Sequence, residues 1–257
     1  MEAYSVFSEI YDEFMDNIPY EKWGNYITDI LKSRGISEGL VCDLGCGTGI
    51  MTRYMADKGY DMIGVDISEE MLLCAREQEE SAGRILYLNQ DMCELELYGT
   101  VGAVISVCDS MNYILDADDF CTVLRKVNNY LEKDGLFIFD MKTPYFYANV
   151  LADSVQVDNR EDATLIWEND YDAETGINAY ELTMFLADCD TPDMYEKYTE
   201  YHEQRAYGID EIKALVKASG MELVGVYDEC TYDEPDENSE RVFFVVKETY
   251  QEGKYYE

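Results

Sequence analysis

The sequence has few basic residues, a single histidine and little proline. Among its 257 residues, 19 lysines and arginines stand against 55 aspartates and glutamates, and the formal net charge is −36. A chain with this charge repels the phosphates of nucleic acids and the surfaces of anionic membranes. We therefore disfavour nucleic acid or a membrane as a partner, and we expect the field of the protein to favour cationic ligands.

Long apolar runs and paired cysteine motifs are also missing. No stretch approaches the roughly 20 apolar residues of a membrane helix, and Glu2 and Glu9 interrupt any apolar run typical of a signal peptide. The eight cysteines include no C-x-x-C pair, and Cys42 and Cys46 lack a second ligand pair for zinc. We expect a cytoplasmic protein with reduced core thiols and no metal site.

The most informative feature that is present is a glycine-rich stretch at residues 41–49. An apolar run leads into Gly45, Gly47 and Gly49, and a helical apolar pattern follows at residues 50–55. This order predicts a strand, a tight turn and a helix. Glycines let the backbone approach a ligand closely, and the start of the helix offers free N–H groups.

Apolar strand patterns alternate with helical patterns along most of the chain. This alternation predicts an α/β fold with a mostly parallel sheet and helices on both faces. Ligands of such sheets bind at the carboxyl ends of the strands. The strands are expected at residues 40–44, 61–65, 84–88, 101–107, 136–139, 221–227 and 241–247, and the candidate strand-end residues are Gly45, Asp66, Asp91, Asp109 and Asp140.

The pattern changes after residue 145 to alternating polar and apolar residues. Residues 163–167, 177–186 and 195–207 predict a three-stranded antiparallel insertion that covers the ligand end as a lid. We therefore divide the chain into a core domain of residues 1–145 and 206–250, a lid of residues 146–205 and a tail of residues 251–257.

Asp66 narrows the ligand class. It lies 21 residues after Gly45, at the end of the second expected strand, where a carboxylate accepts hydrogen bonds from ribose hydroxyls. The last glycine of the dinucleotide-binding pattern is absent, because position 50 is Ile50. The glycine turn together with Asp66 indicates an adenosine-type ligand. The missing glycine at position 50 weighs against a nicotinamide-dependent dehydrogenase.

Three motifs in order carry a family resemblance: residues 43–49 (DLGCGTG), residues 64–68 (GVDIS) and residues 89–92 (NQDM). With them the chain resembles the class I S-adenosylmethionine-dependent methyltransferases. The resemblance implies a Rossmann-like seven-stranded sheet of order 3-2-1-4-5-7-6 with the last strand reversed, and S-adenosylmethionine as cofactor. The cofactor-binding residues it implies are Asp43, Gly45, Cys46, Gly47, Asp66, Ile67, Asp91, Met92 and Cys108.

Within that resemblance, Asp66 would hold the ribose, Ile67 would flank the adenine, and Asp91 would bind the adenine amino group with Met92 beside it. Further motifs, among them Tyr11-Asp12 and residues 109–113 (DSMNY), are similar to a bacterial branch of the family. Some members of that branch carry a tRNA-methyltransferase label. The chain is also similar to the sugar-amine N-methyltransferases, which share the antiparallel lid.

The candidate catalytic residues are His202, Asp109 and Tyr11. His202 on a lid strand either points inward as a general base or only makes a structural hydrogen bond. Asp109 follows the fourth strand, and Tyr11 either borders the acceptor or packs in the core. The candidate substrate-binding residues are Asn112, Tyr113 and Arg205, with Arg205 expected on the inward face beside His202 unless it only pairs with a nearby acid.

The predicted reaction is an in-line transfer of a methyl group to an amine or hydroxyl of a small molecule, with no metal required. Two alternatives from other classes stay open. One is methylation of tRNA or protein, and the other is a catalytically silent S-adenosylmethionine-binding module.

Overall fold

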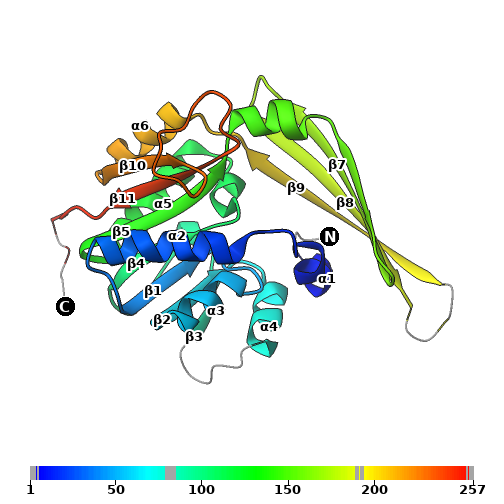
Figure 1. The fold of residues 1–257 in the computed structure, drawn as a ribbon, viewed down its shortest axis with the longest axis horizontal. Helices are drawn as coiled ribbons and strands as arrows, with labels where there is room; N and C mark the ends of the chain where they lie inside the picture. The colour runs from blue at the N-terminus through cyan, green and yellow to red at the C-terminus, as the bar shows by residue number, and fades with distance from the viewer. Residues whose placement is uncertain are drawn as a thin grey trace.

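The computed structural model describes Tyr4, residues 6–78, residues 85–188, Thr191, residues 194–252 and Lys254. Most of the predicted tail, residues 251–257, lies outside these residues. The described chain forms two sheets (Figure 1). The larger has the strand order β10-β11-β5-β4-β1-β2-β3. Its strands are β1 (Gly39–Leu44), β2 (Tyr60–Asp66), β3 (Ile85–Asn89), β4 (Val101–Ser106), β5 (Leu131–Lys142), β10 (Glu222–Asp228) and β11 (Arg241–Lys247).

Only the pairings of β11 in this sheet are antiparallel, to β5 on one side and to β10 on the other. The other neighbours pair in parallel. Numbered along the chain, the strands of this sheet follow the order 3-2-1-4-5-7-6 with the last one reversed. The predicted Rossmann-like topology is therefore confirmed.

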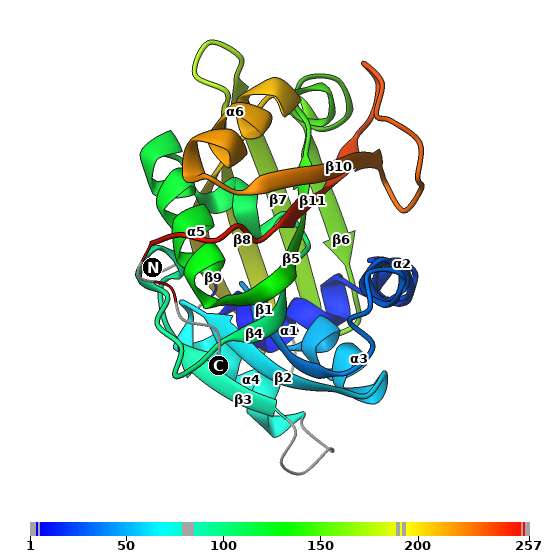
Figure 2. The same ribbon diagram turned by 90° about the vertical axis from the view of Figure 1, so that its left-hand side faces the viewer.

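Helices cover both faces of the large sheet (Figure 2). α5 (Ala117–Tyr130) and α6 (Ile209–Ser219) bury their apolar stripes on one face, while α2 (Tyr20–Ser33) and α3 (Ile50–Asp57) cover the other. α4 (Glu69–Glu77) packs beside β3. Burial on both faces explains why the strands read as nearly continuous apolar runs.

Two short-range signals set helix ends. The Ser68 side chain accepts a hydrogen bond from the backbone N–H of Met71 at 3.1 Å and so caps α4. Gly220 ends α6 in the left-handed conformation, with φ of +87°.

The second sheet is antiparallel, with the order β6-β7-β8-β9. Its strands are β6 (Val155–Asn159), β7 (Ala163–Asp172), β8 (Ile177–Ala187) and β9 (Tyr195–Arg205). The prediction of three strands was one short. β6 is a five-residue edge strand with mostly exposed side chains, so no buried apolar face marks it in the sequence. A short π-helix, η3 (Phe146–Leu151), precedes it and was also not predicted.

The first helix, α1 (Phe7–Phe14), lies between the two sheets (Figure 1). Phe7 and Phe14 pack into a cluster with Leu165, Leu182 and Met184 of the antiparallel sheet. α2 lies on a face of the large sheet, whereas α1 lies at the carboxyl ends of the strands, where Asp12 accepts a hydrogen bond from the Thr48 hydroxyl.

Among the described residues, no helix has both the length and the apolar character needed to cross a membrane.

Candidate active site

The glycine turn after β1 has room for a ligand at one position only. Gly45 and Gly47 have φ of +78° and +53°. A Cβ on Gly45 would stand 2.7 Å from Cβ of Ser110, whereas one on Gly47 would have no heavy atom within 4 Å. Gly45 therefore allows close packing inside the protein, and the backbone of Gly47 borders open space. Cys46 points its side chain into the cluster under α4, its N–H donates to the Val65 carbonyl at 3.0 Å, and its carbonyl accepts from the N–H of Gly49 at 2.9 Å.

Asp66, at the end of β2, is fixed beside this turn. Its carboxylate accepts hydrogen bonds from the N–H groups of Gly47 at 2.8 Å and Ser68 at 2.9 Å. Burial raises the pKa of Asp66, and the hydrogen bonds from the backbone oppose that shift. Each carboxylate oxygen keeps a second lone pair, so Asp66 can still accept from a ligand hydroxyl.

A cavity of about 330 Å³ opens next to Asp66, at the ends of β2 and β3. Ile67 and Asp91, two predicted cofactor residues, line it together with Asn89, Gln90, Glu94 and Glu96. Met92 lies on the inner side, where its methyl carbon would be 3.5 Å from a Cβ on Gly45. The second and third motifs therefore meet the glycine turn, as their order along the strand ends predicts.

Asp43 supplies a buried carboxylate under the turn. Its Oδ2 accepts a hydrogen bond from the Thr52 hydroxyl at 2.6 Å, while its Oδ1 finds no partner in the described part of the chain. Burial raises the pKa of Asp43 to about 7. A buried acceptor without a partner is costly, and a nearby cation would favour its charged form. The site thus fits a positively charged nucleoside with a ribose.

The end of β4 is strained. Cys108 and Asp109 are consecutive non-glycine residues in the left-handed region, with φ of +61° and +55°. The hydroxyls of Tyr11 and Tyr20 each lie 3.8 Å from Sγ of Cys108. Burial raises the pKa of the Cys108 thiol to about 11, so it is a neutral group at physiological pH. Such strain is typical of functional sites. The next residue, Ser110, donates its hydroxyl to the Gly45 carbonyl at 3.1 Å, so this corner lies against the glycine turn.

Asp109 is held in a buried ion-pair network. Its carboxylate lies 2.8 Å from Arg241, 3.3 Å from Lys142 and 2.8 Å from the Gln204 amide nitrogen. Arg241 also pairs with Asp140. Burial alone would raise the pKa of Asp109, but Lys142, Arg241 and Gln204 hold it well below the usual range. Asp109 is a predicted catalytic residue, but this geometry argues against its acting as a base, because its oxygens are already paired and bind a proton weakly.

His202 lies in a cluster of tyrosines. Its ring stacks on Tyr180 with 4.8 Å between ring centroids and meets Tyr4 edge-on at 4.9 Å. The Tyr113 hydroxyl contacts the hydroxyls of both Tyr4 and Tyr180. Nε2 of His202 lies 3.3 Å from Glu200, and Nδ1 has no partner among the described residues. The structure therefore brings His202 and Tyr113 together, across 89 positions of sequence.

Arg205 and Asn112 hold the framework together. Side chains of a strand alternate between its two faces, and Arg205 lies three residues after His202. Gln204, two residues after His202, therefore shares the face of His202, and Arg205 does not. Arg205 pairs with Glu211 at 2.8 Å. Both amide hydrogens of Asn112 are used, by the carbonyls of Lys142 and Arg205. The geometry therefore argues against both predicted substrate contacts.

Sequence reasoning missed four residues of this site: Glu200, Gln204, Arg241 and Tyr180. Glu200, His202 and Gln204 occupy every second position of β9 and are all buried. A run of polar residues at this spacing on an otherwise half-exposed strand is a signal that could have been read. Arg241 had no such signal, because its partners Asp140 and Asp109 lie 101 and 132 positions away in the sequence.

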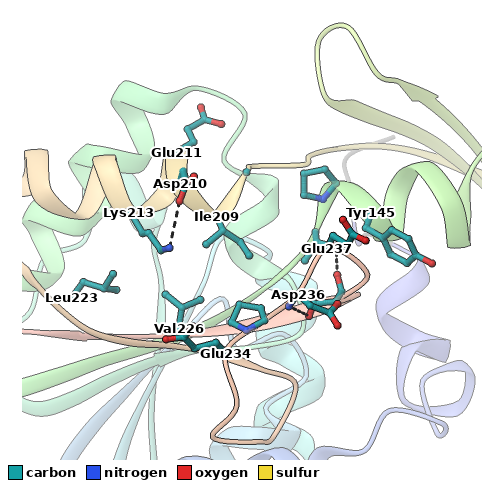
Figure 3. Close-up of a pocket in the computed structure, with 15 residues that line it drawn as sticks. Tyr145, Ile209, Asp210, Glu211, Lys213, Leu223, Val226, Glu234, Asp236 and Glu237 are labelled. Atoms are coloured by element: carbon teal, nitrogen blue, oxygen red, sulfur yellow. Dashed lines mark hydrogen bonds and ion pairs between the residues drawn. The ribbon is translucent and has the colours of Figure 1, made fainter.

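A larger cavity, of about 660 Å³, lies elsewhere (Figure 3). It is bounded by the start of α6, by β10 and by the loop between β10 and β11, and acidic side chains such as Asp210 and Glu237 border it. Asp210 is paired with Lys213. No predicted site residue lines this cavity, so the candidate active site is the meeting point of β1, β2, β3, β4 and β9.

Comparisons with known proteins find relatives over part of the chain and over nearly all of it. A family profile described as a methyltransferase domain matches residues 41–135, which contain the three motifs. YqeM of Bacillus subtilis (strain 168), a provisionally assigned methyltransferase, is 32% identical over 247 residues, which cover 96% of this chain and 97% of that protein.

Two further similarities extend over most of the chain. A crystal structure of a S-adenosylmethionine-dependent methyltransferase from Clostridium acetobutylicum ATCC 824 has a TM-score of 0.84 at 27% identity, covering 96% of this chain and 99% of that one. The dTDP-3-amino-3,4,6-trideoxy-alpha-D-glucopyranose N,N-dimethyltransferase of Streptomyces venezuelae is 23% identical, covering 84% of this chain and 90% of that enzyme.

Proposed function

The chain belongs to the class I S-adenosylmethionine-dependent methyltransferases, and from this premise we propose that it methylates an amine or hydroxyl of a small-molecule acceptor. One observation carries the proposal. The antiparallel sheet places the buried His202 and its tyrosine cluster against the end of β4, where Asp109 and Tyr113 lie. The similarity to an amino-sugar N,N-dimethyltransferase supports an amine of this size class.

The residues of the cofactor side fit S-adenosylmethionine. Asp66 would hold the ribose, the cavity lined by Ile67 and Asp91 would take the adenine, and the backbone at Gly47 would border the methionine part. When bound, the cofactor supplies an activated methyl group on a positively charged sulfur. The protein's own part is to align the acceptor, exclude water and take up a proton.

His202 is the residue we assign to proton uptake. With Nε2 turned to Glu200, Nδ1 is the nitrogen left to accept a proton from the acceptor. Tyr11 keeps its proton, since burial raises its pKa well above the usual value, so its hydroxyl would orient the acceptor rather than deprotonate it. Seven described cysteines are free thiols, which supports a reducing, cytoplasmic setting.

The test has two stages. First, release of S-adenosylhomocysteine is measured with panels of amines, amino sugars, phenols and tRNA; turnover with a small amine or hydroxyl supports the proposal. Turnover with tRNA alone contradicts it. Cofactor binding without release in any panel, including one of protein acceptors, indicates a silent binding module instead.

Second, on the acceptor found, His202→Ala should lower kcat by about a hundredfold and leave cofactor affinity unchanged, since a general base contributes roughly that factor. Tyr201→Ala is the control, because Tyr201 is its neighbour on β9 and is 65% exposed. Full turnover by His202→Ala would remove His202 from the mechanism.

A further inference from the structure

Glu200 is buried on β9 and binds the backbone of the N-terminal segment. Its Oε2 accepts the N–H of Tyr4 at 2.7 Å, and its Oε1 accepts those of Val6 at 2.9 Å and Phe7 at 3.1 Å. Val6 and Phe7 stand at the start of α1, so this carboxylate satisfies N–H groups that no helical carbonyl can reach. The same Oε2 faces Nε2 of His202.

The segment that Glu200 holds touches three strand ends of the cofactor side. We name Tyr4 and residues 6–14 the N-terminal strap. The Tyr4 carbonyl accepts from the Ser68 hydroxyl at 3.3 Å, two residues after Asp66. Asp12 accepts from the Thr48 hydroxyl in the glycine turn. The Tyr4 hydroxyl contacts Tyr113 after β4. The strap therefore lies across the ends of β1, β2 and β4 (Figure 1).

We propose that Glu200 is a positioning residue that fastens the N-terminal strap over the cofactor site, so that S-adenosylmethionine enters, and its product leaves, only when these contacts open. The inference rests on the proposed function, because it takes the ends of β1, β2 and β4 as the cofactor site. The Glu200 carboxylate then has two roles, holding the strap and orienting His202. The Tyr4 contact of the strap and the orientation of His202 depend on the same oxygen, Oε2, while Oε1 holds Val6 and Phe7.

The Glu200→Gln variant tests this with almost no change of shape. A glutamine keeps one oxygen, which can serve either Val6 and Phe7 or Tyr4 and His202, and places an NH₂ group against the other pair of donors. Losing one charge-assisted pair should speed dissociation of S-adenosylhomocysteine about tenfold. Glu203→Gln is the matched control, being the same change on the same strand at an exposed position.

Two measurements on the full-length protein are needed, and neither requires the methyl acceptor. Stopped-flow displacement gives the dissociation rate of S-adenosylhomocysteine, and hydrogen exchange follows the amides of Tyr4, Val6 and Phe7. We expect faster dissociation and faster exchange at these amides in Glu200→Gln, with both unchanged in Glu203→Gln. Asp12→Ala, which frees the strap from the glycine turn, should also speed dissociation and serves if Glu200→Gln fails to fold.

The outcomes separate the two ideas. If the unaltered protein binds neither S-adenosylmethionine nor S-adenosylhomocysteine, the proposed function fails. If it binds them and both strap variants release the product at the rate of Glu203→Gln, the strap inference fails and the cofactor site stands.

Discussion

The two sheets of this protein build the cofactor half and the acceptor half of the proposed site in different ways. The parallel sheet is buried on both faces, and its polar site residues, Asp66 and Asp91 among them, sit where strands stop. The antiparallel sheet has one buried face, and its site residues Glu200 and His202 lie within a strand. This difference explains why sequence motifs mark the cofactor half, whereas no motif marks the acceptor half.

The contacts on the cofactor side join residues that are close in the sequence, whereas those on the acceptor side join residues that are far apart. On the cofactor side, Thr52 reaches Asp43 across 9 positions and Gly47 reaches Asp66 across 19. On the acceptor side, Gln204 reaches Asp109 across 95 positions and Tyr4 reaches Glu200 across 196. Long-range contacts require loop closure before they contribute, so the acceptor half depends on the whole fold being formed.

The largest effect is expected where the two sheets join, at Arg241. Arg241→Met would leave Asp109 and Asp140 without their shared cation, and should lower the free energy of unfolding by about 3–5 kcal/mol. Urea unfolding measures it, with Arg125→Met on the exposed face of α5 as control. Adding Asp140→Asn should restore part of the loss, because Asp109 keeps Lys142. An Arg241→Met protein as stable as the control would show that this network does not stabilise the junction.

A smaller effect, confined to the cofactor half, is expected at Asp66. Asp66→Ala removes the acceptor of two backbone N–H groups and, under the proposed function, of the ribose hydroxyls, and should weaken S-adenosylmethionine binding about a hundredfold. Isothermal titration measures the affinity, and Asp61→Ala, at the other end of β2 and exposed, is the control. Unchanged affinity in Asp66→Ala would place the ribose elsewhere.

A third effect is the dependence of stability on pH, which has opposite signs for Asp43 and for Glu200. Burial raises the pKa of Asp43 to about 7 from 3.8, so the folded state holds a proton that the unfolded state has lost, and stability falls as pH rises from about 4 to 7. Glu200 behaves oppositely: although burial would raise its pKa, hydrogen bonds from His202 and three backbone amides lower it to about 2 from 4.5. Its contribution is complete above about pH 4.5 and is lost towards pH 2.

Asp43→Asn should therefore gain stability relative to the unaltered protein between pH 4 and 7, by at most about 1.4 kcal/mol per pH unit. The stability of Glu200→Gln should differ from that of the unaltered protein in its pH dependence only below about pH 4.5. Urea unfolding at a series of pH values gives both differences. A flat difference for Asp43→Asn across pH 4 to 7 would contradict the raised pKa.

The mostly parallel sheet and the residues at its strand ends could be predicted from the order of residues alone, whereas the strand order came from the resemblance to the methyltransferase family. Apolar runs, glycine turns and caps act over a few residues, so residues 43–49, Asp66 and Asp91 are assigned to strand ends by local pattern. The antiparallel sheet was predicted as well, but without β6, whose exposed edge leaves no apolar pattern.

The role of the charges in the acceptor half, by contrast, follows from the folded arrangement. Asp109 is tied to Arg241 rather than free, Arg205 and Asn112 hold the framework, and Glu200 closes the N-terminal strap. Most of these outcomes depend on which side chains meet across 90 or more positions. The sequence does not show whether a carboxylate contacts a cation, the start of a helix or solvent. Because that partner determines the role of the carboxylate, the role could not be predicted.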